Sequence, residues 1–448
     1  MASSWPPRLG LAALVIVSGF ALTGFGCRPR PAGSNLGTDA TLVVWGLWQN
    51  SAEIAPLLAG FQEATGVTVE YKKVSAVADY EKKLLEALAE KRGPDIFVIH
   101  HTWVESKRAL MSPAPHSVID ERALREEFVE VVADDLLREG EIYALPVSVD
   151  TLALYYNKDL LSAAGIARPP RTWDELQQVV QQLTQVTRFG TINQSALALG
   201  TAANVNRAAD IIQLLFIQSG LPIVAAEPGD VTIANDIGER ALTFYTDFAN
   251  KSKKVYTWDL QQDYSLDAFA EGDTAMMINY SYHIPTIRAK NPRLDFAIAP
   301  LPQIADSAVT NFASYWPYTV SKQSALPDVA WQFVRYLTNT DAAQALNKAA
   351  STPTARRDGI AAAARDPVTG AFAEQALTAA SWPRADIVAT DAIVNTMIDS
   401  VVTGAATAAE SLRRAQDQLN QLRAEPAVQF EESTGGGEQK GPGDIGFF

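Results

Sequence analysis

Short apolar runs alternate with amphipathic stretches across residues 41–99, and this order restricts the fold more than any other feature. Residues 41–45, 67–74 and 95–99 are rich in the β-branched and aromatic side chains typical of strands. Between them, apolar residues recur at helical spacing, with Ile54 and Phe61 on one stripe and Leu84 and Leu88 on the next. Strands separated by helices pair in parallel through right-handed crossovers, so we expect an α/β lobe.

The rest of the chain continues the mixture of strands and helices. A long strand is predicted over residues 145–157, with shorter ones over 274–279 and 294–299. Thr172 and Glu175 have the spacing of a capping box and predict a helix that begins at Trp173. Further helices are expected over residues 209–218, 238–249, 327–350 and 391–422.

Charge and composition exclude several classes of protein. The formal net charge of −14 argues against a nucleic-acid-binding surface, which needs clustered positive charge. One cysteine excludes an intramolecular disulfide, and with only four histidines there is little material for a zinc site. At about 100–200 residues per domain, 448 residues predict two or three folding units.

The N-terminal residues predict that the folded part of the chain lies outside the cytoplasmic membrane. Residues 9–26 are uncharged and precede Cys27, so they suit either a secretory signal or a marginal transmembrane helix. The sequence Gly-Phe-Gly-Cys at 24–27 resembles the lipobox of bacterial lipoproteins, in which the cysteine becomes the lipidated first residue. We therefore expect a signal peptide over 1–26, a lipidated Cys27 with a flexible tether over 27–40, and a disordered tail over 426–448. An uncleaved helical anchor is the alternative.

Five motifs, in order along residues 41–423, indicate a family. They are Gly-Pro-Asp-Ile at 93–96, Tyr-Asn-Lys-Asp-Leu-Leu at 156–161, Phe-Ala-Glu-Gly-Asp-Thr-Ala-Met at 269–276, Pro-Leu-Pro at 300–302 and Ala-Trp-Gln-Phe at 330–333. Together they resemble the bacterial extracellular solute-binding proteins of the sugar-binding family, which includes the maltose-binding proteins. The resemblance implies a two-lobe, hinged α/β fold of the type II periplasmic-binding-protein class, each lobe a mixed sheet flanked by helices.

The resemblance also implies an organisation and a function. Residues 41–148 and 304–352 would form lobe 1, and residues 149–303 and 353–425 lobe 2. A mono- or oligosaccharide would be held between the lobes, without a cofactor or metal. The protein would then deliver it, as a monomer anchored outside the cell membrane by its lipid, to an ABC permease with a cytoplasmic ATPase. Members of this family are not enzymes.

A sugar site needs aromatic rings for the apolar C–H faces and polar groups for the hydroxyls. Trp48 follows the first strand, where a loop would face a cleft at the strand ends. From the resemblance we expect further ligand contacts at the end of the third strand, where the chain crosses between the lobes, in the second lobe, and on the strand that returns to the first lobe. The predicted ligand contacts are Trp48, His100, Thr102, Trp103, Asp150, Asn204, Arg207, Tyr280, Tyr282, Tyr315, Trp316 and Trp382.

Each candidate has a structural alternative. Trp48 could pack into the core, His100 could be a satisfied structural histidine, and Asp150 could be a capped or salt-bridged hinge residue. Asn204 and Arg207 could belong to an ordinary surface. Two other functions also remain open: a clamp for another small solute (a compatible solute, a polyamine, phosphate or iron), and a surface glycosidase with two carboxylates about 5–10 Å apart.

The lipobox-like sequence predicts the state of the mature N-terminus. We expect mass spectrometry of the membrane-extracted protein to find acylated Cys27 as the first residue. Cys27→Ala should leave the protein unprocessed or release it from membranes. Recovery of Met1 on the mature protein would instead support the helical anchor.

Overall fold

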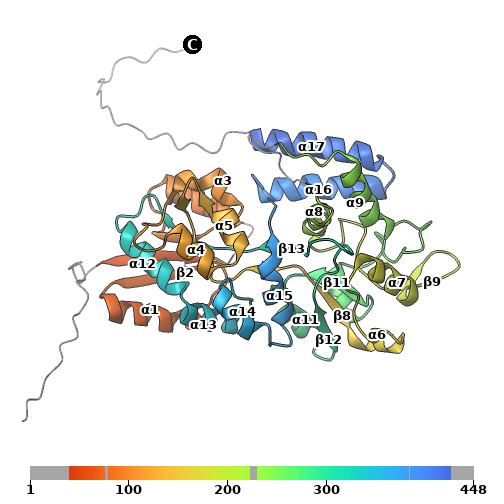
Figure 1. Ribbon diagram of the computed structural model, residues 1–448, viewed down its shortest axis with the longest axis horizontal. Coiled ribbons are helices and arrows are strands. Elements are labelled where there is room, and N and C mark those ends of the chain that lie inside the picture. The colour runs from red at the N-terminus through yellow and green to blue at the C-terminus, as the bar shows by residue number, and fades with distance from the viewer. Residues whose placement is uncertain (1–39, 76–78, 222–229, 383, 425–448) are drawn as a thin grey trace, which may run out of the picture.

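The computed structural model describes residues 40–75, 79–221, 230–382 and 384–424. The predicted signal peptide, Cys27, nearly all of the tether and the tail lie outside these residues. Within them, the chain forms two bodies with separate hydrophobic cores, one at each end of the long axis (Figure 1). We call the body that contains α1 and α12 the first lobe, and the body that contains α8 and α16 the second lobe.

The first lobe is built on a five-stranded mixed sheet with the order β2-β1-β3-β14-β4. Its strands are β1 (Thr41–Gly46), β2 (Thr68–Lys73), β3 (Ile96–Val98), β4 (Met111–Ser112) and β14 (Tyr318–Ser321). β1 pairs in parallel with β2 and β3, as the strand–helix alternation predicts, whereas β14 runs antiparallel to β3 and β4. The main helices are α1 (Ser51–Thr65), α2 (Tyr80–Ala89), α12 (Pro327–Leu337) and α13 (Thr340–Ala350).

Shorter elements complete the first lobe. They are α3 (Trp103–Lys107), η2 (Arg108–Leu110), α4 (Glu121–Glu127), α5 (Glu130–Leu136), β5 (Leu137–Arg138), β6 (Glu141–Ile142) and α14 (Arg357–Ala363). Helix ends follow local chemistry. Asn50 and Glu53 form a capping box at the start of α1, and Gly66 ends that helix with a φ of 80° that suits glycine.

The second lobe contains a three-stranded antiparallel sheet with the order β11-β8-β12. Its strands are β8 (Ala153–Asn157), β11 (Met276–Asn279) and β12 (Phe296–Ala299), and a small hairpin is formed by β9 (Gln185–Val186) and β10 (Ile192–Gln194). The long helices are α7 (Trp173–Leu183), α8 (Ala208–Gln218), α9 (Asp236–Asp247), α16 (Ile387–Val402) and α17 (Ala408–Ala424). The shorter helices are α6 (Lys158–Ala163), α10 (Ser265–Glu271), η3 (Ser281–His283), α11 (Ile284–Lys290) and α15 (Gly370–Gln375). The short helix η4 (Ala376–Thr378) follows α15, and its Ala376 packs in the first core.

The capping box predicted at α7 is only half formed. Thr172 accepts a hydrogen bond from the Glu175 amide at 3.2 Å, as expected. The Glu175 carboxylate, however, accepts from the amide of Arg171 and from the Arg168 guanidinium. A charged guanidinium within reach is a stronger donor than a neutral amide and draws the carboxylate away from Thr172.

The single strand predicted over residues 145–157 is wrong. Leu145 and Ser148 form only isolated bridges with residues of the first lobe, and regular pairing is confined to β7 (Asp150–Thr151) and β8. Val149 packs in the first core, and Leu152 packs in the second. The chain therefore changes pairing partners here because it passes from one sheet to the other.

A small sheet with the order β15-β13-β7 lies where the lobes meet. It consists of β7, β13 (Asn311–Ser314) and β15 (Ala379–Ala380), and within β13 Phe312 belongs to the second core and Ala313 to the first. Ala355 and Ile360 lie in the first core, although the predicted second lobe includes residues 353–425. Phe372 of α15 lies in the second core, so we propose that the third crossing lies between α14 and α15; the chain then contacts the first core again at Ala376.

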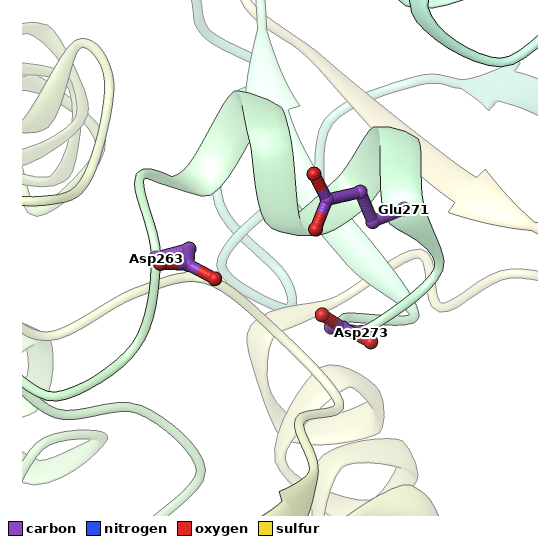
Figure 2. A group of neighbouring side chains, drawn as sticks. All are labelled: Asp263, Glu271 and Asp273. Carbon is purple, nitrogen blue, oxygen red and sulfur yellow. The ribbon is translucent and has the colours of Figure 1, made fainter.

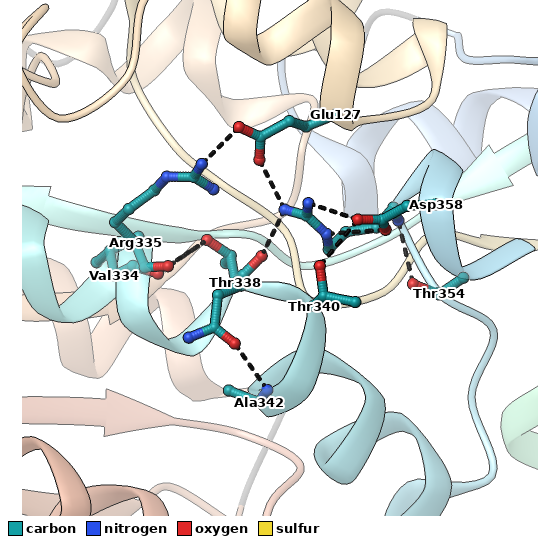
Figure 3. Close-up of polar contacts among 10 residues, drawn as sticks. Glu127, Val334, Arg335, Thr338, Thr340, Ala342, Thr354 and Asp358 are labelled. Carbon is teal, nitrogen blue, oxygen red and sulfur yellow. Dashed lines mark hydrogen bonds and ion pairs between the residues drawn. The ribbon is translucent and has the colours of Figure 1, made fainter. Parts of the chain in front are cut away.

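A carboxylate between two arginines joins three parts of the first lobe (Figure 3). Glu127, at the end of α4, accepts from Arg335 of α12 at 2.5 Å and from Arg356, which precedes α14, at 2.7 Å. Arg356 is buried and also pairs with Asp358 and donates to the Thr338 carbonyl. Burial raises the pKa of Glu127, but the hydrogen bonds from Arg335 and Arg356 outweigh it and lower this pKa below its usual value.

Glu127→Gln tests the contribution of this cluster. The substitution leaves the buried Arg356 with Asp358 as its remaining charged partner and removes the partner of Arg335, so we expect a loss of about 2–3 kcal/mol of unfolding free energy at pH 7. Because the folded-state pKa of Glu127 is lowered, the wild-type advantage is present above the pKa of the unfolded state and is lost as pH falls below about 4. Urea denaturation at several pH values measures both effects.

Glu126→Gln is the matched control. Glu126 also pairs with an arginine, Arg122, but both side chains are largely exposed, so little change is expected. Equal destabilisation by the two substitutions would contradict the stabilising role of the Glu127 cluster.

Candidate ligand-binding site

Trp316 is the centre of an aromatic cluster on the first lobe. Its ring is met edge-on by Trp48 and Tyr80, each at 6.2 Å between centroids, and by His100 and Trp103, each at 5.3 Å. Trp103 is buried, whereas Trp48 is 47% exposed. Residues from four separate segments thus converge, and the half-exposed indole of Trp48, together with the partly buried Trp316, offers an apolar surface to a ligand.

His100 supports this cluster as a neutral side chain. Its Nδ1 is 2.9 Å from the Thr102 hydroxyl, and its Nε2 is 3.2 Å from the hydroxyl of Ser314. Burial, helped by the nearby charge of His101, lowers the pKa of His100 well below its ordinary value. The imidazole therefore binds two hydroxyls and carries no charge at neutral pH.

Asp150 lies at the crossing between the lobes and has protein partners. Its carboxylate accepts from the Thr151 amide at 2.9 Å, from the Ser281 amide at 3.0 Å and from the Ser281 hydroxyl at 2.7 Å. Burial raises the pKa of Asp150 to about 7, in spite of these hydrogen bonds. The contacts join β7 to η3 and favour the hinge alternative; direct contact with a ligand stays a prediction.

The second lobe contributes a stacked pair of tyrosines. Tyr282 is 45% exposed, and its ring lies 5.6 Å from that of Tyr280 with an interplanar angle of 16°. Tyr280 is buried, and the guanidinium of Arg207 lies 5.4 Å from its ring centroid. An exposed aromatic face is thus held on a buried support, as stacking on a sugar ring requires.

Three other predicted contacts have structural roles instead. Asn204 donates to the Asp259 carbonyl at 2.9 Å. Tyr315 is buried, and its hydroxyl donates to Asp135 at 2.7 Å. Trp382 is buried in the second core. The structure does not bring these side chains to the surface that Trp48 and Tyr282 offer, because their polar atoms or rings are already enclosed by the protein.

Sequence reasoning missed Tyr80, Ser281 and Ser314. Tyr80 has helical spacing with Leu84 and Leu88 and so suits a core position, but it packs on Trp316, and its hydroxyl donates to the Val98 carbonyl at 2.8 Å. Ser281 stands between two tyrosines in the sequence, and that position is the one signal that could have identified it. Ser314 carries no comparable signal, since it meets His100 only through long-range folding.

Three exposed carboxylates gather around α10, those of Asp263, Glu271 and Asp273 (Figure 2). One oxygen of each lies within 4.8 Å of the others. No buried or orphaned group joins them among the described residues, so we assign no metal to this cluster.

Comparison with known proteins places this geometry in a family. The sequence model of the bacterial extracellular solute-binding proteins matches residues 48–344, which is more than half of the chain. The protein therefore belongs to this family, and the resemblance seen in its motifs is confirmed.

The relatives are distant but consistent. A maltotriose-binding protein of Pyrococcus abyssi is 26% identical over 270 residues, which cover 58% of this chain and 54% of the relative; the chain thus matches only about half of that protein's length. A putative ABC transporter periplasmic-binding protein of Escherichia coli K12 is 24% identical over 408 residues, covering 84% of this chain and 90% of the relative.

Solved structures show the fold. A crystal structure of a cyclo/maltodextrin-binding protein complexed with maltotetraose superposes with a TM-score of 0.72 at 20% identity, covering 87% of this chain and 98% of the other. The predicted two-lobe fold of the type II class is thereby confirmed. Within the part of the chain that the structure describes, no helix has the length and apolar character needed to cross a bilayer.

The raised pKa of Asp150 predicts a pH effect on stability. With a folded-state pKa of about 7, above the usual carboxyl range, the folded protein retains a proton that the unfolded chain releases. This contribution to the unfolding free energy should therefore fall as pH rises from about 4 to 7, by at most about 1.4 kcal/mol per pH unit. Asp150→Asn should remove it.

Urea denaturation at several pH values from 4.5 to 7.5 measures this effect. At each pH the unfolding free energy of wild type is compared with that of Asp150→Asn. Asp295→Asn, which removes an exposed carboxylate paired with Lys158, is the control. A difference between wild type and Asp150→Asn that stays constant across this range would contradict the raised pKa.

Proposed function

We propose that this protein captures a carbohydrate between its lobes as the substrate-binding component of an ABC importer. The observation that carries the proposal is the pair of exposed aromatic surfaces, Trp48 with Trp316 on the first lobe and Tyr282 on the second. Membership of the solute-binding family supports it, as do relatives named for binding maltotriose and maltodextrins.

The chemistry of these surfaces suits a sugar. The rings of Trp48 and Tyr282 can cover the apolar C–H faces of a pyranose. Hydroxyls can then be bound by Thr102 or Ser314, which contact His100 of the Trp316 cluster, or by Arg207, whose guanidinium lies against the Tyr280 ring. The depressed pKa of His100 keeps the imidazole uncharged, which suits a ligand without charge.

Binding would close the two lobes. A ligand that touches both aromatic surfaces has a higher affinity for the closed form, and it shifts the population by that difference. The crossing from Val149 to Leu152 would take up the backbone change, while each core stays rigid. Small-angle scattering should therefore show a smaller radius of gyration with ligand.

The finer assignments follow from the sequence and the family. We propose that Cys27 carries a lipid that holds the protein outside the cell membrane, and that a monomer delivers the sugar to an ABC permease with a cytoplasmic ATPase. We also propose that the protein is not an enzyme. A thermal-shift screen with sugars, compatible solutes, polyamines and ferric iron separates the candidate ligands, and product analysis after incubation with oligosaccharides tests for glycosidase activity.

Trp48→Ala tests the aromatic surface of the first lobe. With the oligosaccharide found in the screen, calorimetry should show an affinity about 10–50-fold weaker, since removing a stacked indole costs about 1.5–2.5 kcal/mol. The melting temperature of the ligand-free protein should hardly change, because Trp48 is half exposed.

Phe189→Ala is the control for an exposed aromatic residue outside the site. Phe189 is 79% exposed in the turn between β9 and β10, and its removal should leave the affinity unchanged. If Trp48→Ala binds as tightly as wild type, Trp48 does not contact the sugar.

A further inference from the structure

A second carboxylate between two arginines is buried in the second lobe, beside the tyrosine pair. Asp210, in the first turn of α8, accepts from Arg207 at 2.8 Å and from the Tyr280 hydroxyl at 2.9 Å through Oδ2. Its Oδ1 accepts from Arg384, which is also buried and pairs with Asp391 at 2.9 Å. Two guanidiniums thus face two carboxylates, and their charges balance.

This cluster is held by strong electrostatic interactions. Burial raises the pKa of Asp210, but the charges of Arg207 and Arg384 outweigh it and bring this pKa down to about 2. Asp210 is therefore ionised at neutral pH. An ionised carboxylate in a buried site binds its donors tightly, because any lost partner leaves a charge uncompensated.

The cluster contacts the residue that supports the exposed ring of Tyr282. Asp210 accepts a hydrogen bond from the Tyr280 hydroxyl. It also pairs with Arg207, whose guanidinium lies against the Tyr280 ring. Tyr280 in turn supports Tyr282 by stacking. The hydroxyl of Tyr280 donates to Asp210 at 2.9 Å, so Asp210 helps to set the orientation of the ring that supports Tyr282.

The same cluster reaches the first lobe through the segment that carries Arg384. On one side of Arg384 in the sequence, the Ser381 hydroxyl donates to Asp135 of α5. On the other side, the Ala385 carbonyl accepts from the Ser106 hydroxyl of α3 at 3.3 Å. Arg384 is thus held between two contacts with the first lobe while it binds Asp210 of the second.

We propose that Asp210 and Arg384 are positioning residues for ligand binding. They hold the Tyr280–Tyr282 pair in place and join it to the segment that contacts the first lobe, so the aromatic surface of the second lobe is oriented toward the ligand before binding. Neither side chain touches the ligand. The inference rests on the proposed function of Tyr282 as a sugar contact.

A double-mutant cycle with maltotriose and maltotetraose as probes tests the proposal. Asp210→Asn should weaken binding about tenfold or more in the wild-type background, and less than twofold in the Tyr282→Ala background, because the effect passes through Tyr282. Tyr280→Phe, which removes only the hydroxyl and spares the ion pairs, should weaken binding about fivefold. Equal losses with and without Tyr282 would overturn the proposal.

Glu127→Gln is the matched control, since Glu127 is also a carboxylate between two arginines but lies in the first lobe. It should lower stability and leave affinity unchanged in both backgrounds. An affinity loss in Glu127→Gln that equals that of Asp210→Asn would mean that general destabilisation explains the effect, and would also overturn the proposal.

A readout without ligand separates this proposal from the proposed function. The near-ultraviolet circular dichroism of wild type minus that of Tyr282→Ala reports the fixed tyrosine pair, since such signals depend on ordered aromatic packing. Asp210→Asn keeps both tyrosines and should reduce this difference signal when it is measured in the Asp210→Asn background, and Glu127→Gln should not reduce it. If wild type binds neither probe, maltodextrin binding fails, and the spectra alone decide: an unchanged signal in Asp210→Asn overturns the positioning role.

Discussion

The hydrogen bonds between the Asp150 carboxylate and Ser281 hold the part of the chain on which the two-lobe arrangement depends. Val149 belongs to the first core and Leu152 to the second, so the chain passes between two packed interiors within four residues. A polar side chain buried at such a point must be satisfied, and Ser281 supplies both its amide and its hydroxyl. The same contact brings η3, and with it Tyr282, next to the crossing.

Each lobe is also stabilised by one carboxylate between two arginines, Glu127 in the first and Asp210 in the second. The two clusters have different consequences. Glu127 joins helices of one core, and its loss should affect stability alone. Asp210 binds the hydroxyl of Tyr280, so its loss should also change the position of the tyrosine pair that we propose contacts the ligand. The location of a buried ion pair, more than its strength, thus decides whether it matters for binding.

The candidate site was predictable in part. Trp48 and Tyr282 were predicted as ligand contacts, and the structure leaves both half exposed. Tyr315 and Trp382 were also predicted as ligand contacts, yet both are buried, because the packing of helices and strands around them encloses their rings. Aromatic residues suit a core and a sugar site equally well, so their type and position in a motif cannot distinguish the two.

The sequence by itself determined the alternation of strands and helices in the first lobe, the family motifs, and the starts of α7 at Trp173 and α12 at Pro327. These depend on neighbours a few residues apart, through apolar periodicity and capping. Only the tertiary structure decided that residues 145–157 divide between two sheets. It also decided that Ser281 donates hydrogen bonds to the carboxylate of Asp150, and that Arg384 pairs with Asp210. Asp150 and Ser281 are 131 residues apart and Asp210 and Arg384 are 174 apart, and contacts over such distances form only when the complete lobes pack.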